Sequence, residues 1–124
     1  MGFLIVFLGG GLGAALRHGV NLAVARTFGT AFNYATIFEN VSGSLVMGLL
    51  VGYFTFKGVV PQHWRLFMTT GILGGYTTFS AFSLDTILLY ERGQLGLAAL
   101  YVILSVALSV GGLWAGLVLM RHFA

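Results

Sequence analysis

The stretch GGYTTFSAFS, from Gly74 to Ser83, interrupts an apolar run that is otherwise long enough to cross a lipid bilayer. Each of its two adjacent glycines disfavours a helix by about 1 kcal/mol relative to alanine. In lipid, backbone groups that leave a helix must be satisfied inside the protein or at a polar cavity. The stretch therefore predicts a membrane span that is broken at Gly74–Gly75. The break is either a packing kink or a site where free carbonyl groups hold a hard cation such as Na+.

Four apolar runs account for most of the 124-residue chain, which is 58% hydrophobic and only 7% charged. Soluble domains carry about 25% charged residues, so this composition predicts an integral membrane protein. Each run reaches the roughly 20 residues that a membrane helix needs. The runs cover residues 3–25, 34–56, 66–90 and 95–120. We expect one all-α membrane domain over residues 1–124, with four transmembrane helices and a broken third helix.

Several function classes are excluded by what the chain lacks. It has no cysteine, which excludes disulfides and thiolate metal sites. Its net charge of +3 fits basic residues that flank membrane helices at the lipid headgroups, and no basic cluster resembles a nucleic-acid patch. No nucleophile, base and orienting group form a catalytic set. We predict neither an enzyme nor a nucleic-acid-binding protein.

The basic residues of the loops are almost evenly divided between the two sides of the membrane. With the N-terminus inside, Lys57, Arg65 and Arg121 face the cytoplasm, whereas Arg26 and Arg92 face outward. Since the bias of Lys and Arg sets orientation, a difference of one residue predicts insertion both ways up. Two oppositely oriented copies would form an antiparallel homodimer, which four short helices need if they are to enclose a pathway.

Small and polar residues recur at every fourth position, or nearly so, in the second and fourth runs, which places them on one face of each helix. The two sets are Thr36, Asn40, Ser44, Gly48 and Gly52, and Tyr101, Ser105, Ser109, Gly112 and Gly116. Such faces allow close helix packing in lipid, which is our interpretation of most of these positions. Asn40 is different because its NH2 group can also donate to an anion, and both roles remain open for it.

Two phenylalanines lie among the hydroxyls of the opening stretch. Phe79 and Phe82 are three residues apart and therefore share a helix face, with Ser80 and Ser83 beside them. The edge of an aromatic ring carries partial positive charge, so these rings can meet an anion edge-on. A site of this kind, without Lys or Arg, would hold an anion weakly enough to release it, as conduction requires.

Arg17 and Glu39 are charged residues within the expected first and second spans. Charges inside a membrane are costly and are usually paired or line a polar pathway. We expect the two side chains to pair with each other or to line a vestibule.

Taken together, these motifs resemble the Fluc (CrcB) family of fluoride channels over essentially the whole chain. The resemblance rests on Leu16–Arg17 at the end of a glycine-rich first helix, on TIFENVSGSLVMG in the second run and on TTGILGGYTTFSAFS in the third. It implies a small dual-topology protein of the bacterial plasma membrane. Such a protein forms an antiparallel homodimer with two fluoride pathways and a central structural Na+, and exports toxic fluoride passively.

The resemblance also implies roles for particular residues. Phe79 and Phe82 match the family's paired pore phenylalanines, Asn40 matches its pore asparagine and Ser80 the polar residue between the rings. Thr36 and Tyr101 match further pathway positions, and the main-chain carbonyls of Gly74 and Thr77 match those that hold Na+. Arg17 matches the vestibule arginine.

Glu39 departs from the family pattern, which usually has an apolar or small residue before the pore asparagine. A carboxylate there would repel fluoride unless Arg17 or a proton neutralised it. Glu39 also motivates an alternative function, a proton-coupled small multidrug-type transporter, although such proteins place their glutamate in the first helix. A second alternative, a non-transporting scaffold subunit, explains the small-residue faces but not the broken helix.

Overall fold

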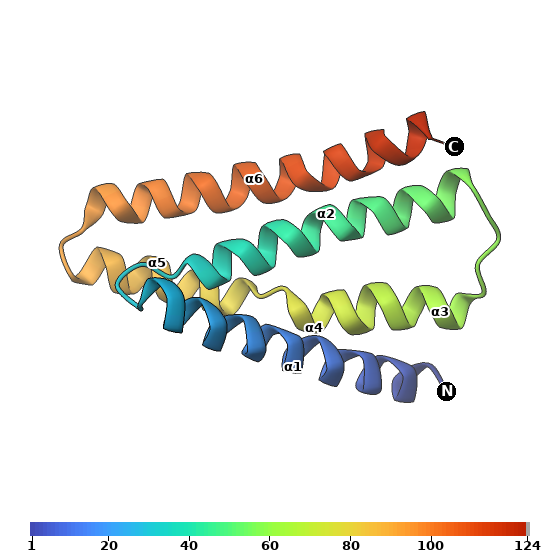
Figure 1. Ribbon diagram of the computed structural model, residues 1–124, viewed down its shortest axis with the longest axis horizontal. Coiled ribbons are helices and arrows are strands. Elements are labelled where there is room, and N and C mark those ends of the chain that lie inside the picture. Colours follow the sequence, from blue (N-terminus) through green and yellow to red (C-terminus); the bar gives the residue numbers. More distant parts are fainter. Residues whose placement is uncertain (124) are drawn as a thin grey trace.

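The computed structural model describes residues 1–123 and shows a bundle of four helical rods (Figure 1). Three rods are continuous helices, namely α1 (Gly2–Phe28), α2 (Tyr34–Phe56) and α6 (Leu95–His122). The remaining rod is made of α3 (Gln62–Leu66), the π-helical η1 (Phe67–Leu73), α4 (Gly74–Tyr76) and α5 (Phe79–Glu91). Over these residues, four segments are long and apolar enough to cross a membrane, the third being Gln62–Glu91. The predicted all-α fold with four spans and a broken third span is confirmed.

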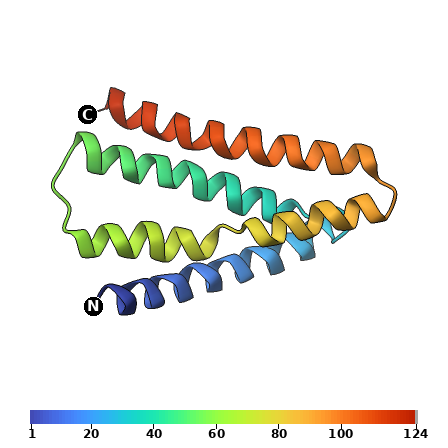
Figure 2. The ribbon, with the colours of Figure 1, turned by 180° about the vertical axis from the view of Figure 1, so that it is seen from behind.

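Both chain termini lie at the same end of the bundle, as Figures 1 and 2 show from opposite sides. The connection between α2 and α3, which begins with Lys57, is at this end too. The connections that follow Arg26 and Arg92 lie at the opposite end. The loop charges are therefore divided between the two ends as the sequence predicts, whereas insertion in both orientations remains a prediction.

The break in the third rod lies three residues further along the chain than we predicted. Gly74 is helical, with φ −62° and ψ −38°. The backbone becomes extended at Thr77 (φ −84°, ψ 157°) and Thr78 (φ −151°, ψ 119°). The placement of the break at Gly74–Gly75 was therefore wrong. The helix restarts at Phe79 because the Thr78 hydroxyl accepts a hydrogen bond from Ala81 N (3.1 Å) and caps the new N-terminus.

The glycines of this region serve close packing instead. A Cβ on Gly75 would overlap the Gly10 carbonyl oxygen, and a Cβ on Gly13 would overlap that of Ile72. Glycine thus allows α1 to lie with its backbone directly against η1 and α4, as expected for small residues at helix contacts in lipid. The glycine pair thus correctly indicated an unusual backbone feature in this span. The feature at Gly75 itself is a close contact with α1, and the break follows it.

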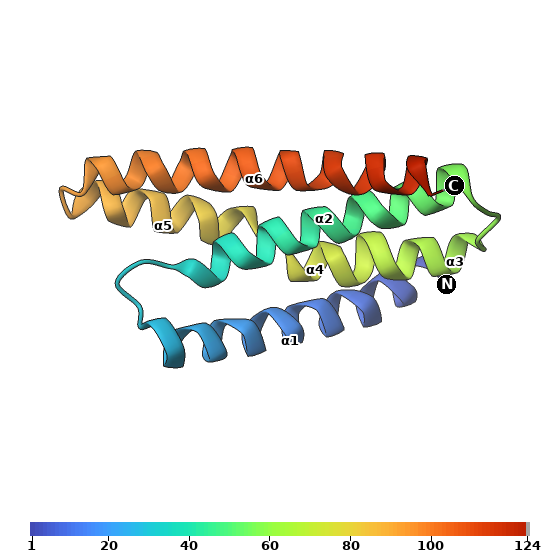
Figure 3. The same cartoon turned by 45° about the horizontal axis from the view of Figure 1, so that its top comes forward.

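A similar contact joins α2 to α6, which run alongside each other (Figure 3). A Cβ on Gly48 would overlap the Leu113 carbonyl oxygen, and one on Gly116 would come within 2.6 Å of the Leu45 carbonyl oxygen. The predicted packing role of these glycines is confirmed. One small-residue contact thus holds α1 against the third rod, and the other holds α2 against α6.

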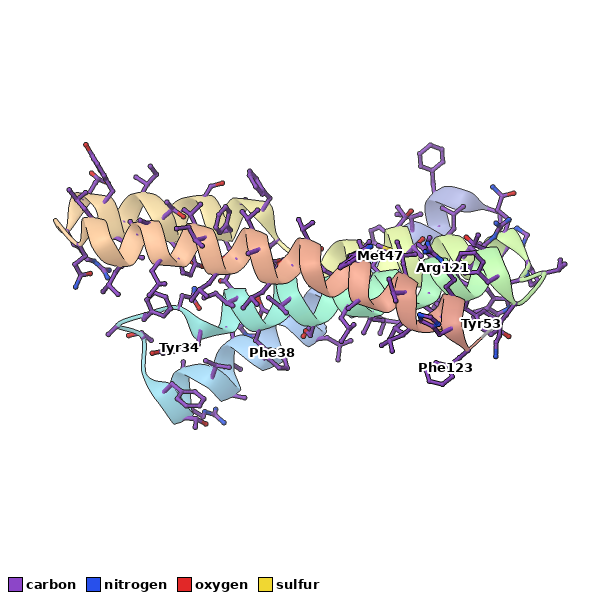
Figure 4. All side chains as sticks on the ribbon, turned by 90° about the horizontal axis from the view of Figure 1, so that it is seen from above. Tyr34, Phe38, Met47, Tyr53, Arg121 and Phe123 are labelled. Carbon is purple, nitrogen blue, oxygen red and sulfur yellow. The ribbon has the colours of Figure 1, made fainter. Side chains whose placement is uncertain are left out.

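Large apolar side chains cover the outside of the bundle, as expected where lipid replaces water. Aromatic residues occur near both ends, where the membrane interface would lie. Figure 4 shows Tyr34 toward one end of the molecule and Tyr53 and Phe123 toward the other.

Candidate functional site

Asn40 joins α2 to the break in the third rod. Its Nδ2 donates to the Thr78 carbonyl oxygen (3.0 Å), and its Oδ1 accepts from Thr78 N (2.7 Å). One carboxamide therefore satisfies both backbone groups of an extended residue. The NH2 group carries two hydrogens, so one N–H of Asn40 is left to donate elsewhere.

The break diverts the helical donors of two carbonyl groups. In an unbroken helix, Thr78 N would donate to the Gly74 carbonyl and Ala81 N to the Thr77 carbonyl. Thr78 N instead donates to Asn40, and Ala81 N donates to the Thr78 hydroxyl. Gly74 and Thr77 are two of the four residues, 74 to 77, whose carbonyls lack a helical donor at the break. They are the two that the family resemblance implies as Na+ ligands. Their oxygens are of the type that a hard monovalent cation prefers.

Arg17 satisfies a further carbonyl of the same region. Its Nε donates to the Gly75 carbonyl oxygen at 3.1 Å, across a separation of 58 residues. Gly75 is the residue whose missing side chain lets α1 approach. Arg17, on α1, thus gives a carbonyl of the third rod the hydrogen bond that the break removes. This is a structural role in addition to the vestibule role that the resemblance implies.

A groove of about 410 Å³ runs beside the break, and we call it the aromatic groove. Its lining combines the two phenylalanines with amide and hydroxyl groups, and it includes no Lys or Arg. The polar and aromatic members are Asn40, Ser44, Thr77, Thr78, Phe79, Phe82, Ser105 and Ser109. The hydroxyl oxygens of Ser105 and Ser109 are buried without a hydrogen-bond partner in residues 1–123.

The rings of Phe79 and Phe82 are 5.5 Å apart between centroids and tilted by 50°. Phe82 is half-buried and stacks on Tyr101 at 5.6 Å, whereas Phe79 is 78% exposed. Tyr101 itself is fully buried, and its hydroxyl donates to Asp85 Oδ2 at 2.6 Å. Tyr101 therefore holds Phe82 in position, while its hydroxyl hydrogen is directed away from the groove.

A second hollow of about 330 Å³, which we call the end cavity, lies toward the connection between α1 and α2. Charged and polar side chains of several elements line it, among them Arg17, Asn33, Thr36, Glu39, Asp85 and Arg92. Asp85 accepts hydrogen bonds from Asn33 (2.9 Å) and Tyr101. Glu39 is 1% exposed, and neither of its carboxylate oxygens has a hydrogen-bond partner in the described part of the chain.

The structure thus divides the predicted site residues between two places. Asn40, Phe79 and Phe82 share the aromatic groove, whereas Thr36, Arg17 and Glu39 line the end cavity. The remaining predicted pathway residue on α5, Ser80, is exposed, with its hydroxyl 3.3 Å from that of Thr78.

Three serines of the groove, Ser44, Ser105 and Ser109, were interpreted from sequence as packing positions. Ser44 lies four residues after Asn40, and Ser105 and Ser109 lie four and eight residues after Tyr101. This spacing was the signal that could have assigned them to the groove.

Comparison with known proteins gives the family of the chain. The family model described as CrcB-like protein, Camphor Resistance (CrcB) matches residues 4–117. A fluoride-specific ion channel FluC 2 of Nitrobacter hamburgensis is 66% identical over 122 residues, or 98% of each chain. A fluoride-specific ion channel FluC of Rhodopseudomonas palustris is 69% identical over 121 residues, again 98% of each chain. One of Methylobacterium nodulans is 58% identical over 120 residues, which cover 97% of this chain and 96% of the relative.

Proposed function

Because the chain belongs to the CrcB family, we propose that it is a fluoride-specific ion channel through which toxic fluoride leaves a bacterial cell passively. Relatives named as such channels match almost every residue of both chains. The function is that of a multi-pass membrane channel and not of an enzyme. Family membership also sets aside the small multidrug-type transporter and the scaffold subunit.

The observation that carries the proposal is the lining of the aromatic groove. Fluoride accepts hydrogen bonds, and Asn40 has an N–H to offer after it has bound Thr78. The buried hydroxyls of Ser105 and Ser109 have no other partner among the described residues. Ring edges of Phe79 and Phe82 add partial positive charge without a formal cation. Such a lining replaces part of the water shell of a small anion and still releases it, as conduction requires.

An antiparallel homodimer with two pathways completes this proposal. Phe79 lines the aromatic groove and yet is 78% exposed, so a second subunit can cover its outer side. The almost equal number of basic residues at the two ends favours insertion in both orientations. Neither subunit then needs to enclose a pathway alone.

A structural Na+ between the subunits is supported by the carbonyls of Gly74 and Thr77, whose helical donors are diverted. Na+ would supply positive charge at the centre of the assembly. One chain offers two carbonyls, so the residues present fit an ion shared by two chains. Main-chain carbonyl oxygens are a donor type that suits a hard monovalent cation.

Fluoride and chloride release from liposomes tests the proposed function directly. We expect vesicles that contain the purified protein to release fluoride rapidly, as measured with a fluoride electrode, and to retain chloride. Equal leakage of both ions would contradict selectivity, and retention of both would contradict the channel function.

A further inference from the structure

We propose that Glu39 is a proton-binding group that sets the net charge of the end cavity, and thereby the rate at which fluoride enters from that end. This inference rests on the proposed fluoride conduction.

Two carboxylates of the end cavity have opposite surroundings. Asp85 Oδ2 accepts hydrogen bonds from Asn33 (2.9 Å) and Tyr101 (2.6 Å), as suits a charged acceptor. Glu39 is 1% exposed, and both of its oxygens lack any hydrogen-bond partner in residues 1–123. A buried polar group without a partner requires an explanation. A role in the aromatic groove is not that explanation, because Glu39 does not line the groove.

A carboxylate buried in this way is stable only if it is paired with a cation or neutralised by a proton. The nearest basic group on α1, Arg17, makes its hydrogen bond to the Gly75 carbonyl and not to Glu39. Arg92 lines the cavity from the end of α5 and also makes no hydrogen bond to Glu39. The geometry therefore leaves a proton as the ligand of Glu39.

The charge of the end cavity depends on that proton. Arg17 and Arg92 contribute two positive charges and Asp85 one negative charge, while Tyr101 is neutral and donates its hydroxyl to Asp85. The cavity is net positive when Glu39 is protonated and neutral when it is ionised. A positive cleft raises the local concentration and entry rate of an anion. Lower pH should therefore speed fluoride entry.

The end cavity is close enough to the groove for this charge to matter. On α2, Glu39 lines the end cavity and the next residue, Asn40, lines the aromatic groove. On α5, Ala81 lines the end cavity and the next residue, Phe82, lines the aromatic groove. A charge on Glu39 thus lies one residue from the proposed hydrogen-bond donor to fluoride.

Fluoride efflux measured as a function of pH tests the inference. Between about pH 5.5 and about pH 8.5, we expect the efflux of the wild-type protein to fall about tenfold, after subtraction of the leak from protein-free liposomes. Glu39→Gln, which is permanently neutral, should remove this pH dependence. Glu91→Gln makes the same change at an exposed residue and should retain it.

Infrared difference spectroscopy between the two pH limits gives a readout that does not depend on flux. We expect the carbonyl band of a protonated carboxylic acid to disappear on raising the pH in the wild type and in Glu91→Gln, but to be missing throughout in Glu39→Gln. An identical pH profile in wild type and Glu39→Gln, or a spectrum without this band, would overturn the inference. Absence of fluoride flux at every pH would instead overturn the proposed function.

Discussion

At the scale of single residues, Asn40 joins two membrane spans because its carboxamide matches the two backbone groups that Thr78 exposes at the break. Neither group has water available inside a bilayer, so each must find a partner within the protein. The same side chain keeps one N–H that is free to donate elsewhere. The sequence left two alternatives for Asn40, a structural role and a role in an anion pathway. One carboxamide has enough hydrogen-bonding groups for both.

Replacing Asn40 by alanine should destabilise the protein, because the N–H and C=O of Thr78 would lose their partners at once. Each unsatisfied buried group costs about 1–3 kcal/mol. We expect a clear drop in the thermal unfolding temperature in detergent, followed by tryptophan fluorescence. As a control, Thr55→Ala removes only a bond of an exposed side chain within its own helix and should cost at most about 0.5 kcal/mol. Equal stability of the two variants would contradict the role of Asn40.

Phe82→Ile should lower fluoride efflux about tenfold or more, which corresponds to about 1.4 kcal/mol in the barrier. Isoleucine keeps the apolar contact with Tyr101 but has no ring edge to present to an anion. Efflux from liposomes measures the effect, with size-exclusion chromatography to verify assembly. Phe3→Ile removes a ring that is 96% exposed and should conduct normally. Normal efflux from Phe82→Ile would remove the ring-edge mechanism.

At the scale of elements, the third span combines an irregular helix with an extended pair of residues. The π-helical η1 precedes the break, and such segments often occur at functional sites. Thr77 and Thr78 leave helical geometry, and Asn40, Arg17 and the Thr78 hydroxyl satisfy backbone groups that would otherwise be left unpaired. The break is therefore supported from two other elements, α1 and α2.

The contact between α1 and η1 can be tested at Gly13. A Cβ there would overlap the carbonyl oxygen of Ile72, and the backbone has no rotamer with which to yield. We expect Gly13→Ala to cost at least as much as other overpacked sites, about 1–3 kcal/mol, and to lower the yield of folded protein. Gly11→Ala, on the same helix, meets no atom within 4 Å and should be neutral or stabilising. A reversal of this order, measured by thermal unfolding, would contradict the packing.

The carbonyls of the break predict a dependence of assembly on Na+. We expect the dimer to dissociate more readily when Na+ is replaced by a larger monovalent cation, because four fixed carbonyls would fit the larger ion poorly. Sedimentation or size-exclusion measurements at matched ionic strength follow the change without any measurement of transport. If assembly does not respond to the cation, no Na+ lies between the subunits.

At the scale of the whole molecule, the bundle buries few side chains and leaves the aromatic groove open on one side. Its glycine contacts hold α1 against the third rod and α2 against α6, and lipid covers most of the remaining surface. Both termini lie at one end of the bundle. The orientation in the membrane therefore depends on the difference in basic residues between that end and the other. An oppositely oriented second subunit would close the groove and share the ion.

Dual insertion can be tested with a complementary pair of charge variants. Arg26→Gln leaves three basic loop residues at the end with the termini and one, Arg92, at the opposite end. This bias should fix the N-terminus inside. The double variant Lys57→Gln and Arg65→Gln leaves one basic loop residue at the end with the termini and two at the opposite end. It should therefore favour insertion with the N-terminus outside. Each variant alone should assemble poorly and conduct little fluoride, whereas coexpression should restore efflux. Wild-type efflux from both variants alone would contradict the antiparallel dimer.

The sequence predicted the class of the protein and the four spans because these depend on composition and on run length, which tertiary contacts do not alter. It predicted a break in the third span because glycines and hydroxyls are unusual there. It misplaced that break, since the effect of Gly75 depends on Gly10 of another helix, a contact that no local pattern contains. The neighbouring groups Asn40, Phe79 and Phe82 were likewise recognisable as candidates.

By itself, the sequence determined that this chain is a membrane bundle of four helices with an interrupted third span, because local hydrophobicity and backbone preference are properties of the residues themselves. Only the tertiary structure decided that Thr77 and Thr78 are the extended residues, that Arg17 donates to the Gly75 carbonyl, and that Glu39 is buried without a partner. These features depend on hydrogen bonds and close contacts between segments far apart in the chain. Hydrophobic patterning does not specify such contacts.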